Sequence, residues 1–258
     1  MLGAIAGDMI GSVYEFDNRR TKEFPLFVEA TAFTDDTILS VAVADVILQG
    51  GDYALAFKDY YQRYPNPIGS YGARFHQWAA SEKLEPYNSW GNGSAMRVSP
   101  VGFAGETLEA VLHEAERTAA VTHNHPEGIK GAQATAAAIF LARTGNPKAH
   151  IRAYITQTFG YDLNRTIEAI RPTYTFNESC QETVPEAIVA FLDATDFEDA
   201  IRNAVSLGGD SDTLTCITGG IAHAFYGSVP DAIAQQVWAR LDEPLGNIVR
   251  AFGDRYGC

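Results

Sequence analysis

The chain has 258 residues, of which 32 are acidic and 19 basic, and its formal net charge is −13. This charge would repel a phosphate backbone, so we expect no nucleic-acid partner. With 46% hydrophobic and 20% charged residues, the chain can bury a large core, which excludes a mainly disordered protein. No run reaches the ~18 apolar residues that a membrane-spanning helix needs, so we expect no membrane partner.

Two features predict a cytoplasmic protein. The apolar start, Met1–Asp8, lacks the basic residues of a signal peptide, because the first basic residue is Arg19. Cys180, Cys216 and Cys258 are an odd set without CxxC spacing, which favours neither a disulfide framework nor a zinc site. Free thiols are typical of a reducing compartment. We expect the protein to act as a monomer.

Apolar periodicity predicts helices along the whole chain. Residues 37–49 are apolar on nearly every face and end at Gly50, which is typical of a central buried helix. Residues 127–143 follow a proline suited to a first helical turn, and residues 214–226 carry another apolar stripe. In chain order, the remaining predicted amphipathic helices are 53–64, 107–120, 148–159, 184–194, 196–206 and 231–241.

Evidence for strands is thin. Residues 24–33 alternate only weakly and are predicted to form a loop or a short edge. Without repeated strand–helix alternation, a doubly wound sheet or a TIM barrel is not expected. No linker or repeat divides the chain, so we predict one compact all-α domain over residues 1–258, with long functional loops near residues 16–33 and 85–100.

Two acidic segments precede two of the apolar helices. FTDDT (33–37) comes before the helix at 37–49, and GGDSDT (208–213) comes before the helix at 214–226. Helix capping alone would explain one Asp or Thr at each place. Two acids packed against a buried helix, however, repel each other and favour protonation unless a cation lies between them.

A shared cation explains both segments together. Its candidate ligands are all oxygens, and these suit Mg²⁺, Mn²⁺ or Ca²⁺ better than zinc or copper. The sequence therefore predicts a metal site. Its predicted ligands are Thr34, Asp35, Asp36, Asp210, Asp212 and Thr213.

Other polar residues have both a structural and a functional interpretation. Glu15 follows an apolar helical stretch and could be an ordinary helix-end charge, and Asp8 could cap a helix or join two helices, so it receives no catalytic role. The turn in Trp90–Arg97 could cradle an anion with its backbone N–H groups. Arg97 could contact a phosphate, but we expect a structural ion pair.

A pair of histidines follows at residues 123 and 125. A His-x-His pair can bind zinc, but no third His or Cys lies at a suitable spacing. We therefore expect His125 to flank the start of the helix after Pro126 and His123 to hydrogen-bond a ligand or a loop.

In their order, AGDMIGSVYE (6–15), FTDDT (33–37), GNGSAMR (91–97), VTH (121–123) and GGDSDT (208–213) resemble the ADP-ribosylglycohydrolase family, also called the DraG or ARH family. The resemblance implies an all-helical fold with two Mg²⁺ or Mn²⁺ ions at the base of a cleft. It assigns the six oxygen ligands named above to the metals. It implies that Glu15 is catalytic at the attacking water and that Asp36 assists it.

The same resemblance implies a set of substrate contacts around the ribose and diphosphate. These are Asn92, Gly93, Ser94, Met96, His123, Gly209 and Ser211. By looser similarity, residues 178–181 would line the pocket near the adenosine end.

The implied activity is metal-assisted hydrolysis of the glycosidic bond between ADP-ribose and an acceptor side chain, on a protein or a small molecule. Arginine-directed members carry an acid just before the Asn-Gly loop, where this chain has Ser89-Trp90. The acceptor, N-linked arginine or O-linked serine, therefore stays open. Three alternatives stay open too: a module that binds ADP-ribose or another nucleotide without cleaving it, a metal-dependent diphosphohydrolase, and a protein whose acids are only helix caps.

Overall fold

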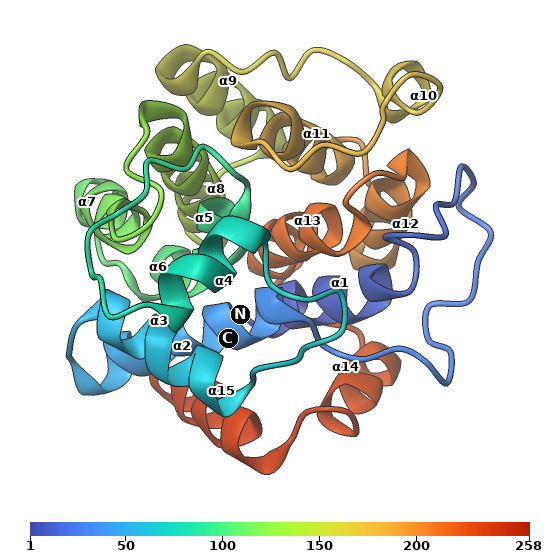
Figure 1. The fold of residues 1–258 in the computed structure, drawn as a ribbon. Helices are drawn as coiled ribbons and strands as arrows, with labels where there is room; N and C mark the ends of the chain where they lie inside the picture. Colours follow the sequence, from blue (N-terminus) through green and yellow to red (C-terminus); the bar gives the residue numbers. More distant parts are fainter.

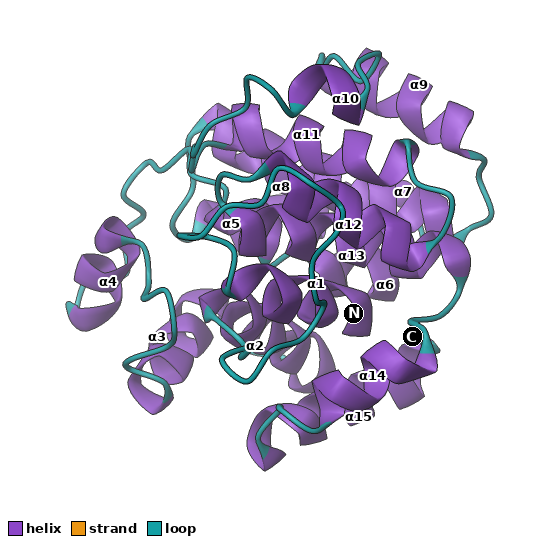
Figure 2. Ribbon diagram, turned by 90° about the vertical axis from the view of Figure 1, so that its right-hand side faces the viewer, coloured by secondary structure: helices purple, strands orange, loops and turns teal.

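Helices supply the regular secondary structure of the computed structural model, which describes residues 1–258 (Figures 1 and 2). The only β pairing is an isolated bridge between Gly91 and Ser179, so the all-α prediction is confirmed. The helices are α1 (Leu2–Ser12), α2 (Asp35–Gln49), α3 (Tyr53–Arg63), α4 (Ala73–Ala80), α5 (Gly93–Met96), α6 (Ser99–Ala104), α7 (Leu108–Ala120), α8 (Pro126–Arg143), α9 (Lys148–Phe159), α10 (Ile167–Ile170), α11 (Cys180–Leu192), α12 (Phe197–Leu207), α13 (Ser211–Tyr226), α14 (Asp231–Trp238) and α15 (Glu243–Tyr256).

Helices α1 and α13 form the centre of the molecule (Figure 1). Every residue of α1 from Gly3 to Ser12 is buried, as is α13 from Ser211 to Ala224. Helices α8, α11 and α12 pack against α13, and α2 packs against α1. The 70 buried residues of the core form one continuous hydrophobic cluster. A helix that is apolar on all sides needs this central position.

Small residues let α1 and α13 approach each other closely. Gly3, Gly7 and Gly11 share one face of α1 because they are four residues apart. Gly3 faces Gly219, and Gly11 faces Ser211, so the two helices run antiparallel. The end of α1 therefore lies beside the start of α13, which brings the residues after α1 next to the second acidic segment.

A buried carboxylate joins α1 to the start of α2. Both oxygens of Asp8 accept hydrogen bonds, from the N–H of Thr34 at 3.0 Å, the hydroxyl of Thr34 at 2.7 Å and the N–H of Thr37 at 3.1 Å. The Thr37 hydroxyl also donates to it. Asp8 thus caps α2 and connects two helices, and both structural roles expected for it are confirmed.

Most predicted helices are confirmed to within a few residues. The sequence patterns missed α4, α10 and α15, and three other segments differ from the prediction. The predicted loop at 85–100 contains α5 and the start of α6, where Pro100 suits a first helical turn. Helix α11 begins at Cys180, before the predicted 184, and accommodates Pro185 in its interior. Helix α14 ends at Trp238, before the predicted 241, and a tighter turn follows in which the Arg240 N–H donates to the Val237 carbonyl at 3.0 Å. None of the helices combines the length and apolar character that a membrane crossing requires.

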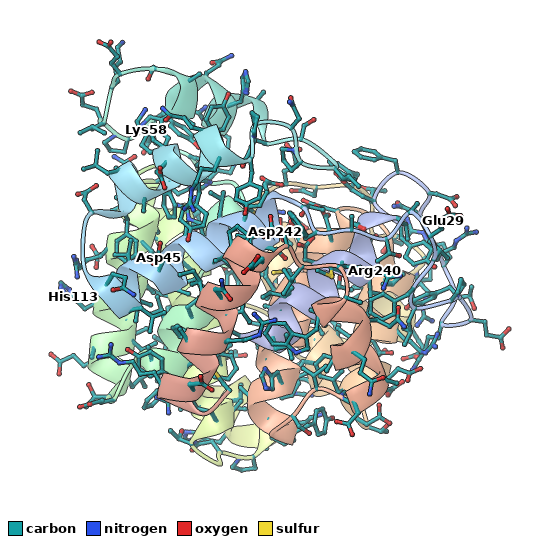
Figure 3. The ribbon with its side chains drawn as sticks, turned by 90° about the horizontal axis from the view of Figure 1, so that it is seen from below. Glu29, Asp45, Lys58, His113, Arg240 and Asp242 are labelled. Carbon is teal, nitrogen blue, oxygen red and sulfur yellow. The ribbon has the colours of Figure 1, made fainter.

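Two tyrosines attach α3 and the chain after it to the rest of the molecule, through Asp45 and Asp242, which are labelled in Figure 3. The Tyr60 hydroxyl donates to Asp45 of α2 at 3.0 Å, and the Tyr64 hydroxyl donates to Asp242, the N-cap of α15, at 2.8 Å. These bonds hold the segment that leads from α3 to α4. That segment forms one wall of the cleft described below.

The closeness of α1 and α13 predicts a severe effect of Gly7→Ala. The added Cβ would lie 1.9 Å from the Thr215 carbonyl oxygen, a backbone atom that cannot move away alone. We expect the free energy of unfolding to fall by about 3 kcal/mol, measured by denaturant unfolding.

The control is Gly246→Ala in α15, where a Cβ meets only the flexible Arg250 side chain at 3.5 Å. Because alanine favours a helix over glycine, this variant should be unchanged or more stable by up to ~1 kcal/mol. Equal stability of the two variants would contradict the close packing of α1 on α13.

Candidate active site

A cleft of 530 Å³ opens between the end of α1, the start of α2, the segment before α4, and the start of α13. Both acidic segments line this one cleft, as the shared-cation hypothesis requires. The predicted site residues that line it are Glu15, Asp35, Asp36, Asn92, Gly93, Met96, His123, Asp210, Asp212 and Thr213. A concave pocket with convergent polar groups is the usual form of an enzyme site.

The first acidic segment begins α2. Thr34 is the N-cap, and its side-chain oxygen accepts from the N–H of Asp36 at 3.2 Å. Asp36 is only 2% exposed; its Oδ1 accepts from the Thr213 hydroxyl at 3.4 Å, and its Oδ2 has no partner. Asp35 is half-buried on the cleft wall. The bond from Thr213 to Asp36 links the two acidic segments directly.

The second acidic segment begins α13 after two glycines with positive φ, 67° at Gly208 and 74° at Gly209. This left-handed turn suits glycine and places Asp210 at the N-cap of α13. Asp210 Oδ2 accepts from the Asn92 side chain at 2.7 Å. Asp212 is buried, and its Oδ1 has no hydrogen-bond partner.

Glu15 completes an acidic cluster with the second segment. One carboxylate oxygen each from Glu15, Asp210 and Asp212 lies within 4.8 Å of the others. Asn18 holds this arrangement, because its side-chain amide donates to the Glu15 carbonyl at 2.8 Å and accepts from the Gly209 N–H at 2.8 Å. Nothing in the sequence singled out Asn18, since its partner lies almost 200 residues away in the chain.

The acids of the cleft form no salt bridge. None of the salt bridges includes Glu15 or an aspartate of the two acidic segments. Burial, followed by repulsion between neighbouring carboxylates, raises the pKa of Asp35, Asp36 and Asp212 well above its ordinary value. The same causes, with Asp210 as the leading neighbour, raise the pKa of Glu15 to about 7.

These residues fit a divalent cation. A native protein pairs almost all of its buried polar atoms, yet Asp36 and Asp212 each keep an unpartnered buried oxygen. The polar groups around these oxygens that line the cleft are carboxylates and the Thr213 hydroxyl, which are the ligands of hard cations. A cation would both pair these oxygens and relieve the repulsion.

The Gly-rich loop, which is the GNGSAMR segment at residues 91–97, supplies free backbone donors beside the acids. The Asn92 N–H donates to the Glu178 carbonyl at 2.7 Å, but the N–H groups of Gly93 and Ser94 donate to no protein acceptor. The Ser94 side chain points away from the cleft and donates to the Gly128 carbonyl at 2.7 Å. Asn92 and Met96 line the cleft next to these amides.

Four predicted site residues do not line the cleft. The hydroxyl of Thr34 donates to Asp8, and that of Ser94 faces α8. Ser211 is fully buried, and its side chain donates to the Tyr14 carbonyl at 3.3 Å. Gly209 packs against Tyr174, where a Cβ would come within 2.7 Å of the ring. In the structure these residues lie behind the residues that do line the cleft.

The two histidines of the pair differ in position. His125 is the N-cap of α8 and accepts from the Glu127 N–H at 3.1 Å, as expected for a flanking residue. His123 is buried and lines the cleft. The ion pair expected for Arg97 is wrong: its guanidinium instead donates to the Thr118 carbonyl at 3.0 Å and lies 4.2 Å from the Phe57 ring centroid.

Sequence reasoning missed much of the cleft wall. Phe16 is 77% exposed and Phe176 is 45% exposed, and both line the opening. Arg74 and Tyr87 line the cleft as well. Of the 178–181 segment that the sequence placed in the pocket by looser similarity, Glu178 lines the cleft and the other three residues do not. Exposed aromatic and charged residues in loops carry no periodic signal, so only the fold could assign them to the cleft.

The chain combines an all-helical fold with an acid-lined cleft, and comparisons with known proteins identify its family. The ADP-ribosylglycohydrolase family model matches residues 1–256. The chain is 25% identical to ADP-ribosylarginine hydrolase Tri1 of Pseudomonas putida (strain GB-1), covering 93% of this chain and 74% of that protein. It is 26% identical to human ADP-ribosylhydrolase ARH3, and the match covers 91% of this chain and 87% of that protein.

A solved structure gives the same result. The structure of an ADP-ribosylglycohydrolase-related protein complex superimposes with a TM-score of 0.72 and 27% identity, covering 97% of this chain and 95% of the other. The chain belongs to the ADP-ribosylglycohydrolase family, as the order of its motifs indicated, and is a glycohydrolase.

The raised pKa values predict that the metal-free protein loses stability as pH rises. The folded state holds protons on Glu15, Asp36 and Asp212 that the unfolded chain releases near pH 4. For Glu15 the stabilisation is therefore complete below about pH 4 and is lost as pH rises through about 7, and Asp36 and Asp212 act in the same direction. Melting temperatures in chelator between about pH 5 and pH 8 should fall, and added Mn²⁺ should restore them most at high pH.

The matched variant is Asp36→Asn with Asp212→Asn, which removes two of the crowded charges. Its melting temperature in chelator should depend less on pH than that of the wild-type protein, and Mn²⁺ should stabilise it less. A wild-type melting temperature that rises over this pH range, or an identical pH dependence in the double variant, would show that these carboxyls are not crowded.

Proposed function

We propose that this glycohydrolase removes ADP-ribose from an acceptor side chain in a reaction that depends on two divalent cations, Mg²⁺ or Mn²⁺. The unpartnered buried oxygens of Asp36 and Asp212, which come from the two linked acidic segments, carry this proposal. Buried carboxylates without partners are costly unless a cation binds them. The proposal also follows the names of the relatives, which are hydrolases of ADP-ribosylated substrates.

The cation ligands would come from the starts of α2 and α13. Asp35, Asp36, Asp210, Asp212 and Thr213 line the cleft, and Thr34 would contribute its remaining lone pair from behind it. Divalent cations at this place would supply a Lewis acid that makes water acidic enough to attack near neutral pH and that orients the ribose hydroxyls. Asn92 supports this set by holding the carboxylate of Asp210.

Glu15 is the proposed general base. Its carboxylate is half-buried, adjoins Asp210 and Asp212, and has a pKa of about 7 in the absence of cations, so it can both take and release a proton near neutral pH. Asn18 fixes the backbone at Glu15 and therefore the reach of its side chain. Asp36 lines the same cleft as Glu15 and is the proposed assisting carboxylate. Both carboxylates would stabilise positive charge that develops on the ribose ring.

The diphosphate of the substrate would bind against the Gly-rich loop. The free N–H groups of Gly93 and Ser94 are suitable donors for its oxygens, with Met96 and His123 beside them. Gly209 and Ser211 would act through the backbone of the turn that places Asp210. The negative charge of the chain is offset locally, because Arg74 and Arg97 also line the cleft.

The names of the two relatives reported above do not decide which acceptor side chain this chain acts on. One is named for arginine, the other is not, and their identities to this chain are equally low at 25% and 26%. N-linked arginine and O-linked serine therefore remain the two proposed acceptors. A protein or small molecule that carries ADP-ribose is the proposed partner, and a cytoplasmic location and a monomeric state remain predictions of the sequence.

The acceptor can be identified with modified peptides. Peptides with arginine-, serine- or aspartate-linked ADP-ribose are incubated with the protein, with and without Mg²⁺, and analysed by mass spectrometry. We expect one linkage to lose its full ADP-ribose mass in the presence of Mg²⁺ and to release intact ADP-ribose. Release of AMP would identify a diphosphohydrolase, and binding without release would identify a binding module.

Substitution of the unpartnered acids should separate catalysis from folding. Asp36→Asn or Asp212→Asn should lower kcat at least ~100-fold and weaken Mn²⁺ binding measured by calorimetry, because each removes a charged ligand. In chelator, either variant should melt at a higher temperature than the wild-type protein, since repulsion is relieved.

Asp45→Asn is the control, because Asp45 lies on α2 outside the cleft and accepts only from Tyr60. It should keep wild-type kcat and Mn²⁺ affinity. Full activity of Asp36→Asn or Asp212→Asn, or activity that survives thorough chelation, would refute the metal-dependent mechanism.

A further inference from the structure

A row of buried polar groups lies behind the cleft and ends at His123. Arg97 Nη2 donates to the Thr122 hydroxyl oxygen at 2.8 Å, and that oxygen lies 2.8 Å from Nδ1 of His123. Arg97 and Thr122 are 0% exposed, and His123 is 5% exposed. The function proposed above uses His123 as a ligand contact and Arg97 only as a local positive charge, and it gives no role to the hydrogen bonds that join them.

The direction of the hydrogen bonds follows from the chemistry of arginine. A guanidinium group can only donate, so the Thr122 oxygen must accept from Arg97. The Thr122 proton then needs an acceptor, because a buried unpartnered hydroxyl is costly. His123 Nδ1 is within reach of it. The Tyr87 hydroxyl is the other side-chain group near Thr122, and no hydrogen bond of ordinary distance joins the two.

The second nitrogen of His123 therefore carries the ring proton. Burial, followed by the charges of Arg97 and Arg74, lowers the pKa of His123 well below its ordinary value, so the ring is neutral. A neutral ring whose Nδ1 accepts has its single proton on Nε2. Nε2 has no protein partner and faces the Gly-rich loop, since a Cβ on Gly93 would lie 3.2 Å from it.

We infer that Thr122 and Arg97 are positioning residues that fix His123 as the Nε2–H tautomer, so that this N–H, beside the Gly93 amide, donates to a diphosphate oxygen of the substrate. The identity of the ligand rests on the proposed function, whereas the tautomer does not. This hydrogen-bonded row provides a donor, the Nε2–H group of a neutral His123, so no positively charged histidine is needed. Affinity for the diphosphate is therefore independent of histidine protonation near neutral pH.

The tautomer can be read directly by nuclear magnetic resonance. Protein labelled with ¹⁵N at its six histidines gives long-range ¹H–¹⁵N spectra, in which His123→Gln identifies the His123 signals by their loss. We expect a neutral ring with the proton on Nε2 and an unprotonated Nδ1. A proton on Nδ1, or a doubly protonated ring at pH 7, overturns the inference.

Three variants test the roles of the groups behind the ring. Thr122→Val removes the hydroxyl with little change of shape and should produce a mixture of tautomers or a shift to Nδ1–H. Thr122→Ser keeps the hydroxyl and should keep the wild-type tautomer. Tyr87→Phe should leave the tautomer unchanged, and a shift in this variant would assign the control of the ring to Tyr87 instead.

The effect on ligand binding is measured with ADP-ribose and Mg²⁺ by calorimetry. Thr122→Val should weaken ADP-ribose binding about tenfold, the usual effect of one lost hydrogen bond to a charged group, and Thr122→Ser should restore it. In turnover, KM should rise while kcat changes little, because the contact is remote from the bond that breaks.

The matched control is Thr118→Val, one helical turn before Thr122 in the chain. Thr118 is equally buried and its hydroxyl donates only to the Ala115 carbonyl, at 2.9 Å. This variant should keep the tautomer and bind ADP-ribose within about twofold of the wild-type protein. Equal weakening in Thr118→Val and Thr122→Val would mean that loss of buried packing explains both, and would overturn the positioning role.

The two proposals fail in different ways. If the wild-type protein binds no ADP-ribose, the proposed function and the identity of the ligand fail, and the spectra still decide the tautomer. If ADP-ribose binds while His123 carries its proton on Nδ1, the proposed function stands and the positioning role of Thr122 and Arg97 fails.

Discussion

The close antiparallel contact between α1 and α13 is the constraint on which the rest of this structure depends. Glycines at Gly3, Gly7 and Gly11 remove the side chains that would separate the two helices. The end of α1 therefore meets the start of α13, and Glu15 comes to lie beside Asp210. Because the contact is made by backbone atoms, it positions the acids more rigidly than side-chain packing would.

That contact gathers negative charge in a buried place, which opposes folding. Asp36 and Asp212 keep unpartnered oxygens, and the pKa of each is raised by burial and by its neighbours. By contrast, Asp8 is just as buried and is satisfied by the backbone and hydroxyl groups of Thr34 and Thr37. The fold thus treats a structural carboxylate and the cleft carboxylates differently, and the difference indicates where a cation would bind.

The cleft also carries groups that can bind an anion. Arg74 and Arg97 line it together with the acids, and the amides of Gly93 and Ser94 donate to no protein acceptor. Asn92 belongs to the same loop and donates to Asp210, so the loop adjoins the acids directly. These groups explain how a chain of net charge −13 can offer a site to an anion.

The sequence by itself determined the helical class, the positions of most long helices and the two acidic segments, because apolar periodicity and helix-start residues act over a few neighbours. It could not show that Arg97 stacks on Phe57 without an ion pair, or that Asn18 holds Glu15 beside Gly209. Those facts depend on segments that are far apart in the chain. Only the tertiary structure decided them, since a side chain's partner is set by which helices pack together and not by its own neighbours.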